Sequence, residues 1–490
     1  MTVSIVTGIA IQSIALWVVH RAIRGQWLRH PGSLFFANAV LGHGITELMQ
    51  WIWPGRNPFR VWITPGALDD WVLLVSVAIL ICAAAYAFIV ARKPGDEPPV
   101  DPARQIADLR LRWLLLLTLP LLFLTWQGKG VLQPVAPGQI ASRDNYATVG
   151  LASTFLVPLL GLIGAVVLIR YGTKWMIPLF LVQGALLSPA GTRSIIITAC
   201  LLALVGAGLC GIRPTRGQVA SLVAVMVLFT SLISVTRSVA GRGTFAAGQS
   251  AAERINGLAE GVTALGDDES REAILNDVVY RFDSNTFGTM VLQSLQSSAQ
   301  PVGLATIGNA VLLTVPSFLD GDKLSKSLEE RGEEAYLDRQ FGLSQRVDWL
   351  PGVFGAMLGY YGPGGLLILA VLLGALIGIA DRVLSRRPTT TRFVAALGVA
   401  QCALLYAAGP QQIIICLRGV LVAVTVLWVV NRWKQTHGAN RRRRQLRLGR
   451  LRNAPGPGSR AISNVPAGEL LRLSGDVDGE RRGLEAKAFR

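Results

Sequence analysis

Long runs of apolar residues, separated by short polar segments, make up most of this chain. A helix needs about 20 predominantly apolar residues to cross the roughly 30 Å hydrocarbon core of a bilayer. By that measure the sequence predicts eleven spans, at roughly 3–19, 31–53, 70–91, 112–127, 147–169, 174–190, 194–212, 218–236, 352–380, 393–408 and 411–430. We therefore expect an all-α polytopic membrane protein with about 11 transmembrane helices.

One long polar stretch, residues 237–350, interrupts the apolar pattern, and we call it the island. It separates an N-terminal transmembrane block of about eight helices (1–236) from a C-terminal block of about three helices (351–430). A basic segment follows at 431–490. An island of this length between membrane blocks predicts chemistry at the membrane surface.

Parts of the island have the apolar spacing of helices. The pattern predicts helices at 251–264 and 270–280, a Gln/Ser-rich helix around Met290, and a charged helix over 324–340. We therefore expect the island to be helical.

The composition agrees with a membrane protein, since 51% of the residues are hydrophobic, 16% are charged and the mean hydropathy is +0.45. No basic segment precedes the first apolar run, so we expect no cleavable signal. The five cysteines all lie in predicted spans. We interpret them as small apolar residues and expect no disulfide framework, no metal site and no cofactor.

The distribution of basic residues predicts the topology, because Lys and Arg concentrate in short cytoplasmic loops. If the basic tail is cytoplasmic and the spans alternate, sixteen basic residues fall in short inside loops and five in short outside loops. The five outside residues are Arg56, Arg60, Lys129, Arg143 and Arg193. This asymmetry predicts an outside N-terminus, a cytoplasmic C-terminus and an extracytoplasmic island.

The formal net charge of +17 is unevenly distributed. The tail 431–490 has fifteen Lys/Arg and five Asp/Glu, and it includes the run Arg441-Arg442-Arg443-Arg444. Such a run beside a span is expected to bind anionic lipid, at about 1 kcal/mol per basic residue near the surface. No aromatic or Gly-rich segment that reads nucleic acid accompanies it, so we expect no nucleic-acid partner. From about Ala454 the composition predicts disorder.

The island is acidic, with ten Lys/Arg and sixteen Asp/Glu, so its arginines require an explanation. A guanidinium stays charged and grips phosphate through two parallel hydrogen bonds. Arginines gathered at the outer surface would therefore form a diphosphate clamp, whereas any single one could equally pair with island carboxylates. The candidates for the clamp are Arg193, Arg237, Arg242, Arg281 and Arg346.

Two acidic residues lie beside two of these arginines: Asp283 follows Arg281 by two positions, and Asp348 follows Arg346 by two. Each pair could be a structural ion pair that keeps the carboxylate ionised. An ionised carboxylate outside the membrane also suits a general base for a sugar hydroxyl. Asp283 and Asp348 are accordingly the candidate catalytic residues.

Other acidic positions allow further interpretations. His43 and Glu47 are four residues apart in a predicted span, so they share a helix face. Ionisable groups within spans are often functional, but a buried, hydrogen-bonded packing pair is the interpretation that we favour over a proton or metal site. Asp69-Asp70 precede a span on the predicted outer side and are either a solvated pair or the base of a glycosyltransferase.

Three features resemble the O-antigen polymerase (Wzy-type), or oligosaccharide repeat-unit polymerase, family over roughly residues 145–430. The turn Gly191-Thr192-Arg193 opens an apolar span, and a large loop precedes the last spans. The third feature is the glycine-rich re-entry that begins at Leu350-Pro351-Gly352 and continues through Gly359-Tyr360-Tyr361-Gly362 to Gly364-Gly365.

The resemblance implies a membrane glycosyltransferase in the cytoplasmic (inner) membrane. It would transfer a glycan on undecaprenyl diphosphate to a repeat unit on a second undecaprenyl diphosphate, at the outer face. External arginines would bind the diphosphates, an acidic residue or a His would deprotonate the acceptor hydroxyl, and Tyr360 and Tyr361 would line the substrate site. Flippase and chain-length regulator proteins are the protein partners that the resemblance suggests.

Two other classes of function stay open. One is a polyprenyl-phosphate-dependent multi-span glycosyltransferase, with Asp69-Asp70 as base, or a ligase of the same superfamily. The other is a transporter of lipid-linked glycans, for which internal repeats would be expected. The two halves of the chain show no such repeat.

Overall fold

The protein is described from a computed structural model. The chain forms two units, Met1–Trp428 and Val429–Arg490. The basic tail, for which we predicted lipid binding and disorder, lies almost wholly outside the described residues. The described ranges are 2–55, 57–91, 111–128, 143–190, 193–212, 214–239, 249–264, 283–303, 333–343, 351–385 and 390–425, with isolated positions in 267–279, 307–311 and 428–432.

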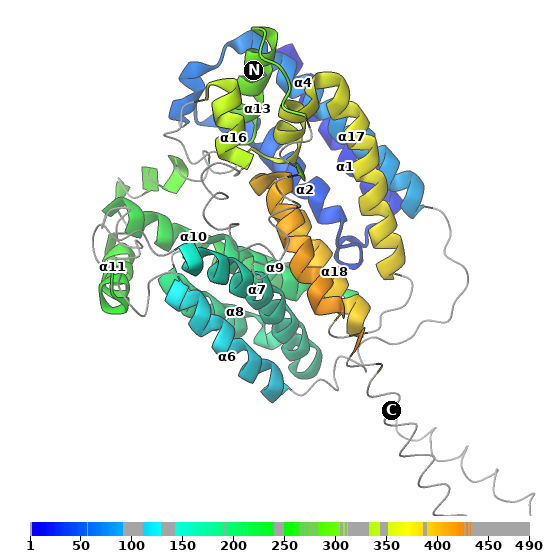
Figure 1. The fold of residues 1–490 in the computed structure, drawn as a ribbon. Coiled ribbons are helices and arrows are strands. Elements are labelled where there is room, and N and C mark those ends of the chain that lie inside the picture. Colours follow the sequence, from blue (N-terminus) through cyan, green and yellow to red (C-terminus); the bar gives the residue numbers. More distant parts are fainter. Residues whose placement is uncertain are drawn as a thin grey trace, which may run out of the picture. The chain divides into compact units, whose positions relative to one another are not determined.

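The described residues form helices and no strand (Figure 1). In chain order the helices are α1 (Val3–Ala22), η1 (Trp27–Arg29), α2 (Ser33–Val40), η2 (Leu41–Ile45), α3 (Thr46–Ile52), η3 (Pro58–Trp62), α4 (Pro65–Val90), α6 (Leu111–Gly128), α7 (Arg143–Tyr171), η4 (Thr173–Trp175), α8 (Met176–Leu187), η5 (Ser188–Ala190), α9 (Arg193–Leu209), α10 (Arg216–Val239), α11 (Ala251–Ala264), α13 (Asn285–Gln296), α16 (Glu333–Phe341), α17 (Val353–Ser385), α18 (Thr390–Leu404) and η8 (Tyr406–Ala408).

Among the residues that the structure describes, five helices are long and apolar enough to cross a membrane, namely Val3–Ala22, Pro65–Val90, Arg216–Thr236, Val353–Leu384 and Tyr406–Thr425. We call the last of these, Tyr406–Thr425, the last span. Shorter apolar helices lie within α6, α7, α8, α9 and α18. The prediction of a multi-span helical membrane protein is thus confirmed in its class, while the count of eleven spans stays a prediction.

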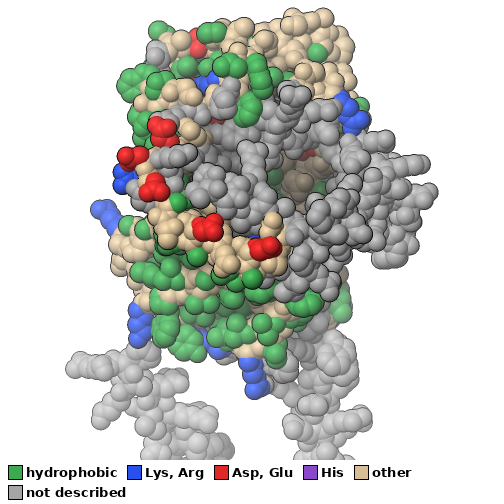
Figure 2. Space-filling view, turned by 90° about the vertical axis from the view of Figure 1, so that its left-hand side faces the viewer, with side chains coloured by type: hydrophobic (Ala, Val, Ile, Leu, Met, Phe, Trp, Pro, Cys, Tyr) green, Lys and Arg blue, Asp and Glu red, His purple; other side chains and the backbone are tan. Residues whose placement is uncertain are grey.

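The surface has the polarity expected of such a protein. On the face drawn in Figure 2, a band of hydrophobic side chains lies between an upper part, which carries the acidic side chains and some basic ones, and a lower edge that carries basic side chains. Apolar side chains on the outer faces of the helices are highly exposed, among them Leu119 on α6, Ile368 on α17 and Leu421 in the last span. Such exposure is stable when lipid rather than water surrounds the helices.

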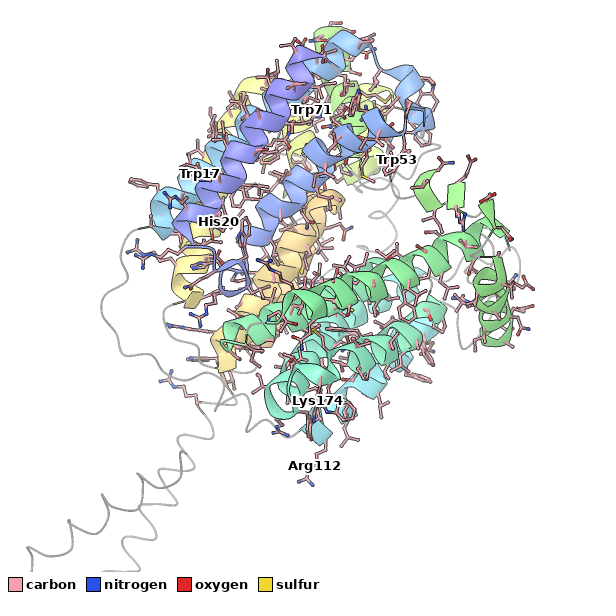
Figure 3. The ribbon with its side chains drawn as sticks, turned by 180° about the vertical axis from the view of Figure 1, so that it is seen from behind. Trp17, His20, Trp53, Trp71, Arg112 and Lys174 are labelled. Atoms are coloured by element: carbon pink, nitrogen blue, oxygen red, sulfur yellow. The ribbon has the colours of Figure 1, made fainter. Side chains whose placement is uncertain are left out.

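The helix ends that the charge distribution assigns to the cytoplasmic side lie together. The Asp381 carboxylate near the end of α17 accepts hydrogen bonds from the backbone N–H of Gly32 at 2.9 Å and from the Tyr86 hydroxyl at 2.7 Å. Figure 3 shows Arg112 and Lys174 at one end of the helices and Trp53 and Trp71 toward the other. The contacts agree with the predicted alternation, and the orientation in the membrane stays a prediction.

Local capping sets the beginnings of two spans. The Thr2 hydroxyl accepts the backbone N–H of Ile5 at the start of α1, and the Thr64 hydroxyl accepts the N–H of Ala67 at the start of α4. Pro65 is the first residue of α4, where the missing N–H would have no intrahelical partner. Both helix starts therefore follow from the sequence.

Glycines allow close packing between α4 and its two neighbours. A Cβ at Gly8 of α1 would lie 2.7 Å from the side chain of Val72, and a Cβ at Gly374 of α17 would lie 2.1 Å from the carbonyl oxygen of Cys82. Small residues at such crossings are what lets helix backbones approach each other in a membrane. These crossings make α1, α4 and α17 one packed group.

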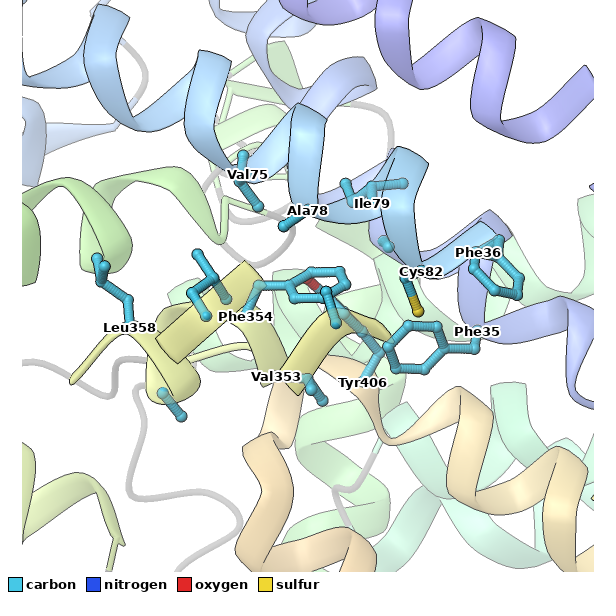
Figure 4. Packing of buried hydrophobic residues seen from close by; sticks show 14 of the residues in the cluster. Phe35, Phe36, Val75, Ala78, Ile79, Cys82, Val353, Phe354, Leu358 and Tyr406 are labelled. Atoms are coloured by element: carbon cyan, nitrogen blue, oxygen red, sulfur yellow. The ribbon is translucent and has the colours of Figure 1, made fainter. Parts of the chain in front are cut away.

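An aromatic cluster fills the space between this group and α2. Phe35 packs edge-on against Phe36, Phe354 and Tyr406, with ring centroids 5.1–5.9 Å apart (Figure 4). Edge-to-face pairs of this kind contribute about 0.5–1.5 kcal/mol beyond their buried area. The cluster joins α2, α17 and η8 into one core.

Helices α6 to α10 form a second core, which α18 and η1 connect to the first. Ala203 of α9 would contact a Cβ at Gly164 of α7 at 2.5 Å. Phe393 of α18 approaches Gly206 of α9, and Leu28 of η1 approaches Gly208. Both cores therefore belong to one unit.

Three island helices are described. Helix α11 has the predicted bounds, α13 is the predicted Gln/Ser-rich helix, and α16 is the described part of the predicted charged helix. The predicted helix at 270–280 is described only at isolated positions. The side of the membrane on which the island lies stays a prediction.

We expect Gly374→Ala to lower the thermal unfolding midpoint of the detergent-solubilised protein, because the added methyl group meets the backbone of α4. Overpacking of this kind destabilises by about 1–3 kcal/mol. Gly364→Ala is the matched control in the same helix, since no atom lies within 4 Å of a Cβ built there. Equal midpoints for the two variants would contradict the close α4–α17 packing.

Candidate functional site

A π-helical turn breaks the predicted span at 31–53 into α2, η2 and α3. The turn, Leu41–Ile45, has one more residue per turn than an α-helix and contains His43. Turns of this kind often occur at functional sites. His43 is completely buried and Glu47 is 3% exposed, so the ring and the carboxylate both need partners inside the protein.

Asn285, the first residue of α13, supplies partners to both groups. Its amide Nδ2 donates to the Glu47 carboxylate at 2.7 Å and to the His43 backbone carbonyl at 2.8 Å. Its Oδ1 lies 2.6 Å from His43 Nδ1 and accepts the Trp71 indole N–H at 3.1 Å. The amide makes four hydrogen bonds, the most that its two donors and two lone pairs allow.

These contacts determine the protonation of His43. Because the amide group of Asn285 uses its nitrogen as a donor elsewhere, Oδ1 can only accept, so His43 Nδ1 must carry a proton. The other ring nitrogen, Nε2, lies 2.6 Å from the Tyr406 hydroxyl. In the neutral ring Nε2 is an acceptor, and Tyr406 donates to it. His43 thus connects α13 to the last span.

The charges of the site come from three residues that are far apart in the sequence. Arg60 of η3 forms a bidentate ion pair with Glu47, and its Nε donates to the Asp283 carboxylate at 3.1 Å. The Arg60 side chain is 18% exposed, whereas the Asp283 side chain is fully buried. We call Glu47, Arg60 and Asp283 the triad. With both acids ionised, its two carboxylates and one guanidinium have a formal charge of −1.

Asp283 accepts five hydrogen bonds. One oxygen accepts from Asn57 at 2.7 Å, from the Thr286 hydroxyl at 2.7 Å and from Arg60, and the other accepts from the backbone N–H groups of Asn285 and Thr286 at 2.9 and 3.1 Å. The last two are orphan donors at the start of α13, so Asp283 caps this helix.

The electrostatics keep Asp283 and Arg60 charged. Burial alone would raise the pKa of Asp283, but the guanidinium of Arg60 and the hydrogen bonds from Thr286 and Asn57 lower it below the usual value. Burial likewise opposes the charge of Arg60, while Asp283 and Glu47 raise its pKa. A carboxylate saturated with donors is suited to fixing Arg60 and α13 in place.

A second set of contacts joins α11 to η5 and to the end of α10, close to Arg193 and Arg237. The Arg254 guanidinium of α11 is buried and donates to the carbonyl of Pro189 at 3.0 Å, four residues before Arg193. A Cβ at Gly261 of the same helix would lie 2.3 Å from the hydroxyl oxygen of Thr236, which precedes Arg237. Helix α11 therefore contacts the segments just before both predicted phosphate-binding positions.

The structure describes only some of the residues predicted from the sequence. Asp283 belongs to the hydrogen-bonded group around His43, Arg60 and Asn285, which we call the buried network. Arg193 is the first residue of α9, and Arg237 lies in the last turn of α10. Tyr360 is buried, and its hydroxyl donates to the carboxylate of Glu333, while Tyr361 is half-buried. Arg242, Arg281, Arg346 and Asp348 lie outside the described residues.

Two of the expected groups have partners that the sequence did not indicate. Asp283 is bonded to Arg60, a partner that sequence proximity did not indicate. His43 and Glu47 are buried and hydrogen-bonded, as the favoured interpretation required, but Asn285 lies between them. The acidic pair at the start of α4 is at the surface, where Asp69 accepts from the Thr2 hydroxyl at 2.6 Å and Asp70 accepts from the Gln296 amide at 3.2 Å.

Sequence reasoning missed several residues of the network, namely Asn57, Arg60, Asn285, Thr286 and Tyr406. Arg60 alone had a visible indication, because it is a basic residue in a short loop predicted to lie outside, where basic residues are rare. Among the described residues, no group of three or more His, Cys, Asp or Glu side chains could hold a metal ion.

No protein-family model, no curated protein and no solved structure matches the chain. The resemblance to repeat-unit polymerases therefore stays a hypothesis that rests on the sequence motifs.

We expect Arg60→Ala to destabilise the protein by about 3–5 kcal/mol, because it leaves two buried carboxylates without their cation. The measurement is thermal unfolding in detergent. Arg271→Ala is the control, since the Arg271–Asp268 pair is 66% and 96% exposed, and such a pair contributes about 0–1 kcal/mol. Comparable losses in the two variants would show that Arg60 is not the central cation.

We also expect Asp283→Asn to flatten the acid limb of the stability profile. The pKa of Asp283 is lower in the folded chain than its unfolded value of about 3.9. Its contribution is therefore complete above that value and is lost as the pH falls through the folded pKa. Unfolding midpoints measured from pH 7 down to about pH 2 should fall less steeply for the variant, which starts about 1–3 kcal/mol less stable. Parallel profiles would refute the assignment.

Proposed function

We propose that the protein is a membrane glycan polymerase, which transfers an undecaprenyl-diphosphate-linked glycan to an undecaprenyl-diphosphate-linked repeat unit at the outer face of the cytoplasmic membrane. The observation that carries the proposal is the position of α11. Its contacts with Pro189 and Thr236 bring one island helix against the segments that lead into Arg193 and Arg237. Arginines from separate helices can then act on one diphosphate.

The chemistry requires little beyond positioning and charge. The glycan donor already carries a diphosphate leaving group, so the enzyme must align two lipid-tethered substrates and neutralise the departing negative charge. We assign that neutralisation to Arg193 and Arg237, together with the predicted island arginine Arg281. Bidentate guanidinium contacts are well matched to phosphate oxygens.

The acceptor hydroxyl also needs a base. Asp283 is ionised, but five donors occupy its two oxygens, and we therefore propose that it supports catalysis by fixing Arg60 and the start of α13. Asp348 is then the proposed general base. Arg60 is the partly exposed member of the triad, which gives the buried network a side that a substrate can reach.

One observation favours a second candidate, a polyprenyl-phosphate-dependent glycosyltransferase or a ligase. Asp69 and Asp70 lie near the surface at the start of α4, and each accepts one side-chain hydrogen bond among those described. Their oxygens therefore accept fewer hydrogen bonds than those of Asp283 and leave more room for a substrate hydroxyl. This candidate places the base on α4 instead of in the island.

Deletion of the gene should abolish glycan chains longer than one repeat unit, with single repeat units accumulating on the lipid carrier. Electrophoretic separation of the surface glycan measures the chain length directly. Restoration of the ladder by the intact gene is the control. Unchanged chain lengths in the deletion strain would eliminate the polymerase, and a block before any outer-face glycan appears would favour a transporter.

Alanine substitutions separate the two glycosyltransferase candidates. We expect Arg193→Ala and Arg237→Ala each to reduce the polymer at least tenfold, because one charge-assisted contact contributes about 1.5–3 kcal/mol. Asp69→Ala and Asp70→Ala should leave the ladder intact, and Arg271→Ala serves as an exposed arginine control. Loss of the ladder in the two aspartate variants alone would replace the polymerase by the second candidate.

A further inference from the structure

Helix α17 is broken near its outer end. Gly362 has a φ of +70°, outside the helical region, and Pro363 follows it. Proline has no N–H, so the Gly359 carbonyl loses the donor that a continuous helix would supply four residues later. The glycine at the break gives the backbone a conformation that other residues rarely adopt.

An island segment supplies the missing donors. The N–H of Val302 donates to the Gly359 carbonyl at 3.0 Å, and the N–H of Gly303 donates to the Tyr360 carbonyl at 2.8 Å. Pro301 lies beside Gly362, 3.6 Å from a Cβ built there. The break in the membrane helix is therefore completed by backbone from the island.

Helix α16 packs on the same place. A Cβ at Gly359 would lie 2.9 Å from Leu337 and 3.1 Å from Phe341, and both of these side chains are buried. Gly359 is thus needed for the approach of α16. Gly364, beyond the break, has open space around it.

Glu333 joins α16 to two membrane helices through one carboxylate. One oxygen accepts the Tyr360 hydroxyl, and the other accepts the N–H of Gln411 at 3.0 Å. The backbone N–H of Glu333 donates in return to the Gln411 side-chain oxygen at 2.8 Å. Gly409 is required here, because a Cβ would lie 2.6 Å from the carboxylate.

The turn η8 extends this contact to the buried network. Tyr406, three residues before Gly409, donates to His43, and the Ala407 carbonyl accepts the N–H of Gly352 at 3.1 Å. The segment from Tyr406 to Gln411 is therefore held by His43 at its start and by Glu333 at its end. A displacement of α16 would therefore disturb the hydrogen bonds of both Gln411 and Tyr406.

We infer that Glu333 is a positioning residue that couples the island to the broken helix α17 and to the last span, through Tyr360 and Gln411. Its part in glycan transfer, which rests on the proposed function, is to hold the Tyr360–Tyr361 segment and η8 in one arrangement while substrate is bound. A buried carboxylate is expensive unless it is fully hydrogen-bonded. A position that only required packing would be better filled by an apolar side chain.

Hydrogen exchange tests the coupling without any substrate. In Glu333→Ala we expect the Val302 and Gly303 amides to exchange about 10- to 100-fold faster, the range expected for loss of hydrogen bonds to a charged group. Tyr360→Phe removes one of these bonds and should give a smaller increase, which keeps the test valid if the alanine variant folds poorly. Glu260→Gln, an exposed acid on α11, is the matched control and should match the wild-type protein.

Wild-type exchange at Val302 and Gly303 in both variants would overturn the inference, whatever the protein's activity. Polymerisation of a lipid-linked repeat unit by the purified protein supplies the second readout. We expect Glu333→Ala to lower kcat with little change in KM. The kcat of Tyr360→Phe should lie between that of Glu333→Ala and that of the wild-type protein. Absence of polymer with the wild-type protein would instead refute the proposed function, and faster exchange in Glu333→Ala would still support the coupling.

Discussion

The guanidinium of Arg60 holds two buried carboxylates, and the arrangement of the polar end of the helices depends on this contact. Without the cation, Glu47 and Asp283 would repel each other in a site from which water is largely excluded. With it, Asp283 stays ionised and caps α13, and Glu47 becomes an acceptor for Asn285. A single positive charge thus allows an island helix to dock onto a membrane helix.

The polar networks also explain how an acidic island can be part of a membrane protein. Side chains and backbone N–H groups at helix termini and breaks satisfy backbone groups that lipid could not satisfy. Asp283 does this at the start of α13, Glu333 at Gln411 in the last span, and Val302 at the break of α17. The island is consequently fastened by hydrogen bonds at the places where the membrane helices begin or break.

The sequence predicted the helices better than it predicted their contacts. Apolar runs marked the spans because burial in lipid requires about 20 consecutive apolar residues, a local property of the chain. Asp283 was found as a candidate because it is an acid next to an arginine, yet its partner Arg60 lies in a different loop. Asn285 and Tyr406 had no distinguishing local pattern, since their roles arise only when distant helices meet.

The π-turn Leu41–Ile45 has a consequence for how this chain can evolve. One residue of a helix corresponds to a rotation of about 100°. The extra residue therefore determines which face of α3 carries Glu47, relative to the core-packed face of α2. Loss of any single residue from the turn would rotate Glu47 away from Arg60, even if every amino-acid type were kept. Related chains that use the same triad should accordingly keep the length of this turn.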